Sequence, residues 1–201
     1  MKEKLILASK SARRAEILRA VDWPFQAVAA NIDETRGVSE DAIAYVKRLA
    51  RKKAETVAAK ISDGLVLGAD TVVVVDDEVL GQPCDDEDAQ RMLRLLSGKW
   101  HQVVTGVALL RAGNHSESGV PSGAAPLVCK SLTDHETTRV RFCEMSAEEI
   151  DWYVSTGEPR DKAGAYAIQG SAALFIEEIE GDYFNIVGLP VRLVYELLRK
   201  M

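Results

Sequence analysis

Two hydroxyl side chains and two guanidinium groups lie close together near the start of the chain. Ser9, Ser11, Arg13 and Arg14 follow a short apolar run and precede a pattern typical of a helix. Unpaired N–H groups at a helix start and the forked guanidinium group both bind anionic oxygens. This segment therefore predicts an anion site, and its alternative is an ordinary serine cap with solvated arginines.

Carboxylates occur at two further places where they could do chemistry. Asp33 and Glu34 are adjacent in a loop, where they could hold a divalent cation or be simple turn residues. Asp70 lies inside the apolar run 65–75, which reads as a buried strand. A carboxylate is costly there unless it is paired, hydrogen-bonded or bound to metal, so Asp70 favours a functional site.

The glycine-rich segment 157–170 contains Lys162, which could reach a phosphate, and Gln169, which could bond to a base edge. A long irregular connection is the alternative. Lys53 lies in a basic run on a long helical pattern, where a solvated face is the default interpretation. The three histidines, at 101, 115 and 135, lack metal-ligand spacing and are assigned structural or surface roles.

Composition limits the class of protein. The 201 residues fit one domain, 1–201, and the net charge of −6 argues against a protein that coats nucleic acid or anionic membrane. No apolar run approaches the ~18 residues of a membrane span, and we expect the protein to stay in the cytoplasm. Cys84, Cys129 and Cys143 have no spacing typical of zinc or disulfide sites and are expected to be reduced thiols.

The elements that must position these residues alternate along the chain, which predicts an α/β fold. Strands are expected at 4–8, 25–29, 65–75, 79–80, 102–110, 137–143 and 174–180. Helices are expected at 12–21, 39–61, 86–96, 146–155 and 191–199. Ser39 is the expected cap of the second helix and Gly64 its stop, and residues 112–126 are expected to form an exposed loop.

The separate signals occur together in the order found in one family. The motifs are Leu7-Ala-Ser-Lys-Ser-Ala-Arg-Arg14, Asp33-Glu34, Lys53-Ala54, Gly68-Ala-Asp-Thr-Val-Val73, Leu95-Leu-Ser-Gly98, Val104-Thr-Gly-Val107, Gly157-Glu-Pro159, Asp161-Lys-Ala-Gly-Ala-Tyr166, Ile168-Gln-Gly170 and Val187-Gly-Leu-Pro190. Together they resemble the Maf (septum-formation) family of nucleoside triphosphate pyrophosphatases, nearly from end to end.

The resemblance implies a fold like that of the inosine triphosphate pyrophosphatases, with a mixed twisted sheet flanked by helices and a cleft between two lobes. It implies hydrolysis of a nucleoside triphosphate to the monophosphate and pyrophosphate with Mg²⁺ or Mn²⁺. The positions of Arg13, Thr71 and Gln169 match those that mark the dTTP/UTP branch of the family.

The same resemblance implies roles for individual residues. Glu34 and Asp70 would bind the metal, and Asp70 would also be the general base for in-line attack of water on the α-phosphorus. Thr71 and Gln169 would contact the pyrimidine. The triphosphate would be held by Ser9, Arg13, Arg14, Lys53 and Lys162.

Two positions depart from the family pattern. Ala12 replaces the usual proline of the first motif, which should have a mild effect. Gln82 stands where the family generally has lysine. A neutral contact there is weaker than a charge-assisted one by about 1–2 kcal/mol, so we expect lower efficiency.

Two other functions stay open. One is a nucleotide-binding regulator without catalysis, linked to septum formation and cell division, and the other is a purine-directed pyrophosphatase of the inosine triphosphate type. In each case we expect a homodimer that binds neither nucleic acid stably nor membrane.

Overall fold

The structure is a computed structural model that describes residues 3–113 and 127–201. Its α-helices are α1 (Ala12–Ala20), α2 (Ala42–Ala58), α3 (Asp86–Leu96), α4 (Ala147–Ser155), α5 (Tyr183–Val187) and α6 (Val191–Leu198). Short 3-10 helices are η1 (Glu158–Asp161), η2 (Ala163–Ala165) and η3 (Ser171–Phe175). The strands are β1 (Leu5–Leu7), β2 (Phe25–Ala27), β3 (Gly64–Val75), β4 (Glu78–Leu80), β5 (Trp100–Gly113), β6 (Leu127–Phe142) and β7 (Ile176–Glu180).

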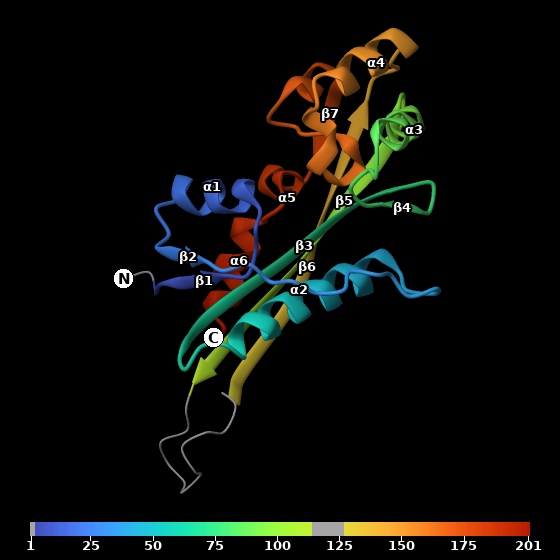
Figure 1. The fold of residues 1–201 in the computed structure, drawn as a ribbon. Coiled ribbons are helices and arrows are strands. Elements are labelled where there is room, and N and C mark those ends of the chain that lie inside the picture. Colours follow the sequence, from blue (N-terminus) through green and yellow to red (C-terminus); the bar gives the residue numbers. More distant parts are fainter. Residues whose placement is uncertain (1–2, 114–126) are drawn as a thin grey trace, which may run out of the picture. The chain divides into compact units, whose positions relative to one another are not determined.

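The described strands form one mixed sheet in the order β2-β1-β3-β5-β6-β7, with β4 paired to β3 (Figure 1). Strand β1 runs parallel to both β2 and β3. The pairs β3–β4 and β6–β7 are antiparallel. The predicted α/β fold with a mixed sheet is therefore confirmed.

The chain divides into two compact units, which we describe separately. The first comprises the described parts of Met1–Asp70, Gly106–His135 and Gly188–Met201, and the second comprises Thr71–Thr105 and Glu136–Val187. Each unit is thus assembled from segments that are distant in the sequence. The expectation of a single domain, 1–201, stays a prediction.

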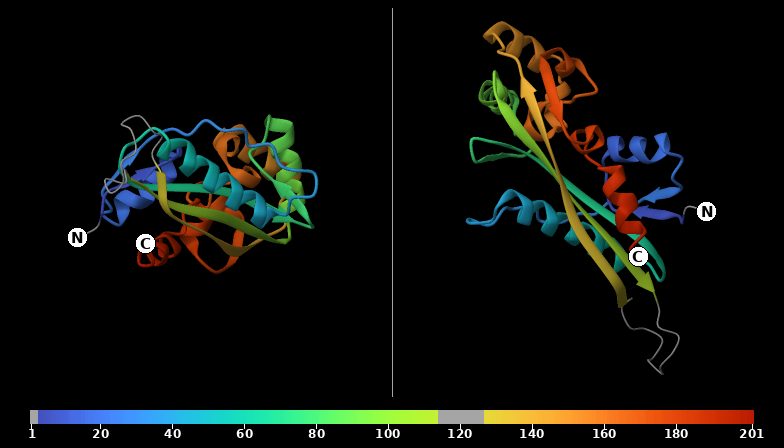
Figure 2. Two further views of the ribbon diagram at one scale, coloured as in Figure 1. Left: turned by 90° about the horizontal axis from the view of Figure 1, so that it is seen from below. Right: turned by 180° about the vertical axis from the view of Figure 1, so that it is seen from behind.

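In the first unit, α2 covers one face of the strands, and Figure 2 shows α6 on the opposite face. The apolar side of α2 carries Ala50, Ala54 and Val57, which pack with Val66 of β3 and Ala108 of β5. These side chains recur at helical spacing, so their burial fixes the face that α2 turns to the sheet. This packing positions Lys53, which lies on the same helix.

Two glycines let α2 approach the sheet closely. A Cβ atom at Gly68 of β3 would lie 2.0 Å from the carbonyl oxygen of Ala50, and one at Gly106 of β5 would lie 2.4 Å from that of Val46. Both neighbours are backbone atoms of α2, which cannot rotate away as a side chain could. The short distance between helix and sheet therefore requires glycine at both positions.

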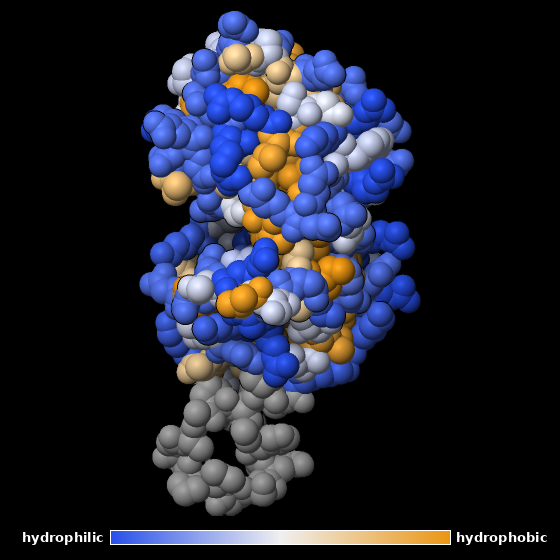
Figure 3. Space-filling view, turned by 90° about the vertical axis from the view of Figure 1, so that its right-hand side faces the viewer, coloured by the Kyte–Doolittle hydropathy of each residue, from blue (hydrophilic) through white to orange (hydrophobic). Residues whose placement is uncertain are grey.

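The second unit has its own core, built around α3, α4 and the strands beside them. Tyr153 of α4, Leu93 of α3 and Phe142 of β6 are fully buried in it. Ser146 and Glu149 form the predicted capping box at the start of α4. Acidic residues in the first turns of α3 and α4, such as Asp86 and Glu148, are exposed. Most of the molecular face drawn in Figure 3 has a hydrophilic colour.

Some predicted boundaries were wrong. The side chain of Asp41, rather than Ser39, caps α2 by accepting a hydrogen bond from the Ala44 N–H, because the helix begins only at Ala42. The helix ends at Ala58, and Gly64 begins β3 with a φ of 142° instead of stopping the helix.

The C-terminal half differs more. Strand β6 begins at Leu127, ten residues before the expected start, since its half-buried residues show no alternation. Residues 171–175 form η3, so β7 begins at Ile176, and the short helix α5 was not predicted. Of the predicted loop 112–126, Ala112 and Gly113 belong to β5, and 114–126 lie outside the described residues. Among the helices in residues 3–113 and 127–201, none combines the length and the apolar character of a membrane-spanning segment.

We predict that Gly68→Ala destabilises the protein by about 3 kcal/mol, because the new methyl group forces α2 away from β3. Urea unfolding measures the change. Gly81→Ala is the control, since no heavy atom beyond its two chain neighbours lies within 4 Å of its Cβ position, and it should change stability by less than about 0.5 kcal/mol. Equal stability of the two variants would contradict the prediction.

Candidate active site

The predicted anion site lies where β1 leads into α1. Ser11 caps the helix, and its hydroxyl oxygen accepts a hydrogen bond from the Arg14 N–H at 3.4 Å. The buried Ser9 hydroxyl accepts from the Ser11 N–H at 3.1 Å and from Arg14 Nη1 at 3.2 Å. Arg14 Nε donates to the Gly188 carbonyl at 2.8 Å. The helix start and one guanidinium are thus held in a single hydrogen-bonded group.

The cap interpretation is therefore confirmed for Ser11, whereas the anion site stays a prediction. Ser11 is an ordinary cap, whereas Arg14 is anchored rather than solvated. Burial lowers the pKa of the Arg14 guanidinium, and the nearby charge of Asp70 opposes that shift. An arginine remains protonated in such surroundings, so the site carries a fixed positive charge. Arg13 precedes it on α1 and is half-buried.

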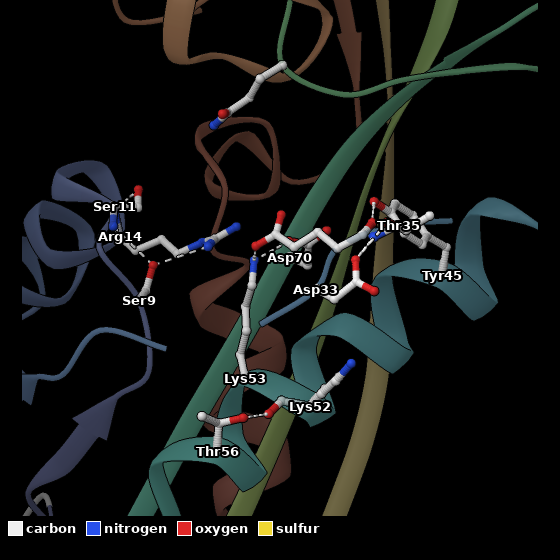
Figure 4. A network of polar contacts seen from close by, with 12 residues as sticks. Ser9, Ser11, Arg14, Asp33, Thr35, Tyr45, Lys52, Lys53, Thr56 and Asp70 are labelled. Carbon is white, nitrogen blue, oxygen red and sulfur yellow. Dashed lines mark hydrogen bonds and ion pairs between the residues drawn. The ribbon is translucent and has the colours of Figure 1, made fainter. Parts of the chain in front are cut away.

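Asp70 and Lys53 form a buried ion pair between β3 and α2. Lys53 Nζ lies 2.6 Å from Asp70 Oδ1, and the two residues are only 8% and 7% exposed. Burial raises the pKa of the Asp70 carboxyl above its ordinary value, while the charges of Lys53 and Arg14 act in the opposite direction. Figure 4 shows Lys53 and Arg14 both pointing toward this carboxylate. The default interpretation of Lys53 as a residue of a solvated face was wrong.

Glu34 joins this pair from the segment that follows β2. Its Oε1 lies 2.8 Å from Lys53 Nζ, and its side chain is half-exposed. One ammonium group therefore contacts two carboxylates, of which one is buried and one faces solvent. Asp33 does not join them, because its Oδ1 accepts hydrogen bonds from the N–H and hydroxyl of Thr35 (Figure 4). Of the two adjacent acids, Asp33 is a turn residue and Glu34 is the candidate site residue.

The oxygen atoms of this site are of the kind that a hard divalent cation prefers, and Mg²⁺ is commonly held by one or two carboxylates together with substrate phosphates. Glu34 Oε1 and Asp70 Oδ1 both contact Lys53 Nζ, so the ammonium lies at the point where these two oxygens converge. Among the described residues no group of three or more His, Cys, Asp or Glu side chains could hold a metal. The two carboxylates therefore suit a cation that shares its ligands with a phosphorylated substrate.

The second unit carries the other predicted substrate residues. The Thr71 hydroxyl lies 2.9 Å from that of the fully buried Thr105. Gln82 Nε2 donates to the Asp161 carbonyl at 3.2 Å, and Lys162 Nζ bonds to the Asp161 carboxylate. Gln82 and Lys162 thus both contact Asp161. Gln169 follows η2 in the chain and is exposed.

The loop that presents Lys162 and Gln169 is fastened to α4. Glu158 Oε1 accepts a hydrogen bond from the Tyr153 hydroxyl at 2.7 Å, and its Oε2 accepts from the Ser171 N–H at 3.0 Å. The Tyr153 oxygen in turn accepts from the Ala167 N–H at 3.2 Å. Burial and the adjacent Glu158 raise the pKa of Tyr153, so the phenol stays a donor. The segment is therefore an ordered connection held to α4, and the phosphate and base contacts of Lys162 and Gln169 stay predictions.

Several further assignments can be placed. His101 is buried in a structural role, with Nε2 2.9 Å from the Tyr166 hydroxyl, and burial lowers its pKa to about 4. His135 is half-buried, and His115 lies outside the described residues. Cys84 and Cys143 are free thiols, as expected, whereas the Cys129 side chain is not described.

Sequence reasoning missed the residues that support this site. Tyr45 and Arg48 of α2 bond to the segment that carries Glu34, and Tyr153 and Glu158 hold the loop 158–171. The i,i+3 spacing of Tyr45 and Arg48, which places them on one helix face, was the available signal. Nothing in the local sequence indicates that Gly188 provides the acceptor for Arg14.

Comparison with known proteins identifies the family. A family model described as Maf-like protein matches residues 4–201. The chain belongs to the Maf family. The resemblance seen in the sequence motifs is therefore confirmed over almost the whole chain.

Relatives within the Maf family carry a common name. The chain is 47% identical over 196 residues to a protein of Symbiobacterium thermophilum named dTTP/UTP pyrophosphatase, covering 98% of this chain and 93% of that protein. A protein of the same name from Bacillus cytotoxicus is 45% identical, with 97% and 94% covered. The structure of the Staphylococcus aureus Ham1 protein matches with a TM-score of 0.51 at 14% identity, over 98% of this chain and 99% of that one. This last likeness supports the fold alone.

We predict that Gly170→Ala loosens the loop 158–171 of this Maf protein, which Tyr153 and Glu158 hold to α4. A Cβ at this position would lie 2.2 Å from Glu158 Oε2, so the carboxylate must leave its hydrogen bonds. The expected loss of stability is about 1–3 kcal/mol, measured by urea unfolding.

A double-mutant cycle provides the control for this prediction. In a Glu158→Ala background the same glycine substitution should cost little, because the clashing carboxylate is absent. An equal cost in both backgrounds would show that Gly170 matters for a reason other than Glu158.

Proposed function

We propose that this protein hydrolyses dTTP and UTP to the nucleoside monophosphate and pyrophosphate. The observation that carries the proposal is the buried Lys53, whose ammonium contacts Asp70 and Glu34 beside the anchored Arg14. Such a group combines fixed positive charge for phosphate oxygens with carboxylates for a metal and a base. The names of relatives at 43–47% identity supply the substrate class.

In the proposed reaction, some residues of the first unit bind phosphate and others bind the metal. Ser9, Arg13, Arg14 and Lys53 hold phosphate oxygens, with the α1 N-terminus providing further donors. Glu34 and Asp70 hold Mg²⁺ or Mn²⁺, which when bound supplies charge neutralisation for the triphosphate. The residues predicted as substrate contacts in the second unit are Thr71, Gln82, Lys162 and Gln169.

Asp70 is the proposed general base. It accepts a proton from the attacking water as that oxygen bonds to the α-phosphorus, and the bond from the α-phosphorus to the bridging oxygen breaks. Pyrophosphate leaves with the electrons of that bond, and its negative charge is stabilised by the arginine and lysine side chains. Burial and the ion pair with Lys53 hold this carboxylate in one place, which suits the role.

We propose further that the protein is a cytoplasmic homodimer that acts on free nucleotides and binds neither nucleic acid stably nor membrane. A nucleotide-binding regulator and a purine-directed pyrophosphatase are the rival functions that the following measurements separate.

Pyrophosphate release from a panel of dTTP, UTP, CTP, GTP, ITP and 7-methyl-GTP, each with Mg²⁺ or Mn²⁺, tests the substrate class. We expect dTTP and UTP to have the highest kcat/KM. A purine triphosphate at the head of the ranking would contradict the pyrimidine assignment. Calorimetric binding of UTP with no product formed would favour the regulator.

Asp70→Asn tests the general base. We expect turnover below a tenth of the wild-type rate with UTP, because an amide cannot accept the proton, and a general base contributes about 10²–10⁴-fold. The exposed Asp76, which forms an ion pair with Lys99, provides the control Asp76→Asn, expected to leave turnover unchanged. Turnover above a tenth in Asp70→Asn would show that another group is the base.

A further inference from the structure

The segment that carries Glu34 needs anchors from outside itself. Residues 31–37 form neither helix nor strand, so their backbone groups have no partners in a ladder. Glu34 itself is half-exposed. A flexible side chain on an irregular segment loses conformational entropy when it is held in one place. Its position beside Lys53 therefore depends on what holds the backbone.

Two side chains of α2 bond to this backbone. The Tyr45 hydroxyl donates to the Glu34 carbonyl at 2.7 Å, and Arg48 Nη2 donates to the Thr35 carbonyl at 3.0 Å. The two residues are three apart on one helix face, and the Arg48 Cζ atom lies 5.5 Å from the centre of the Tyr45 ring. Successive carbonyls of the segment are thus bonded to successive turns of the helix.

Glu40 completes the arrangement at the other end of the segment. Its carboxylate binds Arg48 through two hydrogen bonds, Nε to Oε1 at 2.6 Å and Nη2 to Oε2 at 2.7 Å. Its Oε2 also accepts the Gly37 N–H at 3.1 Å. The Arg48 hydrogen bonds lower the pKa of Glu40 to about 2, so the pair stays charged at neutral pH. These hydrogen bonds fix the orientation in which Arg48 contacts Thr35.

We infer that Tyr45 and Arg48 are positioning residues, which hold the Glu34 carboxylate beside Lys53 for its role in metal and substrate binding. Lys53 is on the same helix, so α2 sets the place of both the ammonium and the carboxylate. This inference rests on the proposed function for its catalytic consequence. The placement of Glu34 can be tested without it.

Matched variants on one helix separate positioning from general stability. Tyr45→Phe removes the hydroxyl and keeps the ring against Arg48, and Arg48→Gln removes the guanidinium. The control is Arg51→Gln, whose arginine lies one turn further along and pairs with Glu55 at 2.7 Å. Each substitution is made in the parent and in a Glu34→Gln background.

Turnover gives the first readout. Loss of one hydrogen bond should lower kcat/KM for UTP about fivefold in Tyr45→Phe, and Arg48→Gln should lower it at least as much. In the Glu34→Gln background neither substitution should have a further effect, because both act through Glu34. An equal loss in both backgrounds, or a loss in Arg51→Gln of the same size, overturns the inference.

Mn²⁺ alone gives a readout that is independent of hydrolysis. We expect Mn²⁺ to raise the melting temperature of the parent, to raise that of Tyr45→Phe less, and to have little effect on Glu34→Gln. Hydrogen exchange of the amides of residues 33–37 should become faster in Tyr45→Phe and Arg48→Gln but not in Arg51→Gln.

Failure of the proposed function and failure of the positioning inference give different results. If the parent hydrolyses neither dTTP nor UTP, the proposed function fails, while the Mn²⁺ and exchange results still decide whether Tyr45 and Arg48 position Glu34. If Mn²⁺ raises the melting temperatures of the parent and of Tyr45→Phe equally, or if exchange at residues 33–37 is unchanged in Tyr45→Phe and Arg48→Gln, the inference is overturned even where hydrolysis is normal.

Discussion

The candidate site depends on one buried ammonium group. Lys53 is almost completely buried, and a charge in that position is tolerated only when it is paired and hydrogen-bonded. Asp70 provides the buried counter-charge, and Glu34 contacts the same atom from a segment at the surface. Removal of Lys53 would leave the buried Asp70 carboxylate without its ion-pair partner, whereas removal of Glu34 would leave the Lys53–Asp70 pair in place.

The surroundings of these three side chains follow from how close α2 lies to the sheet. Gly68 and Gly106 allow the helix backbone to approach β3 and β5, and the helix then carries its lysine to the carboxylate of β3. The same helix fixes the Glu34 segment through Tyr45 and Arg48. Helix α2 thus determines both how deeply the Lys53 ammonium is buried and where the Glu34 carboxylate lies.

Much of this could be predicted from the sequence, for physical reasons. Asp70 was detectable because a carboxylate inside an apolar strand requires a partner, and the α1 start was detectable because capping is local. Lys53 was not, since a lysine in a basic run gives no sign of burial, and only the family resemblance indicated it. The roles of Tyr45, Glu158 and Gly188 depend on contacts with other segments, which periodicity and spacing do not encode.

One hydrogen bond has a consequence for the order in which the protein folds. Arg14 Nε donates to the Gly188 carbonyl, so the first turn of α1 is tied to a residue 174 positions further along the chain. A contact between such distant residues closes a long loop, and the chain loses that loop's entropy before the contact stabilises it. Helix α1 and its serine cap can form from local contacts alone, whereas the orientation of the Arg14 guanidinium is set only when the two distant segments have come together.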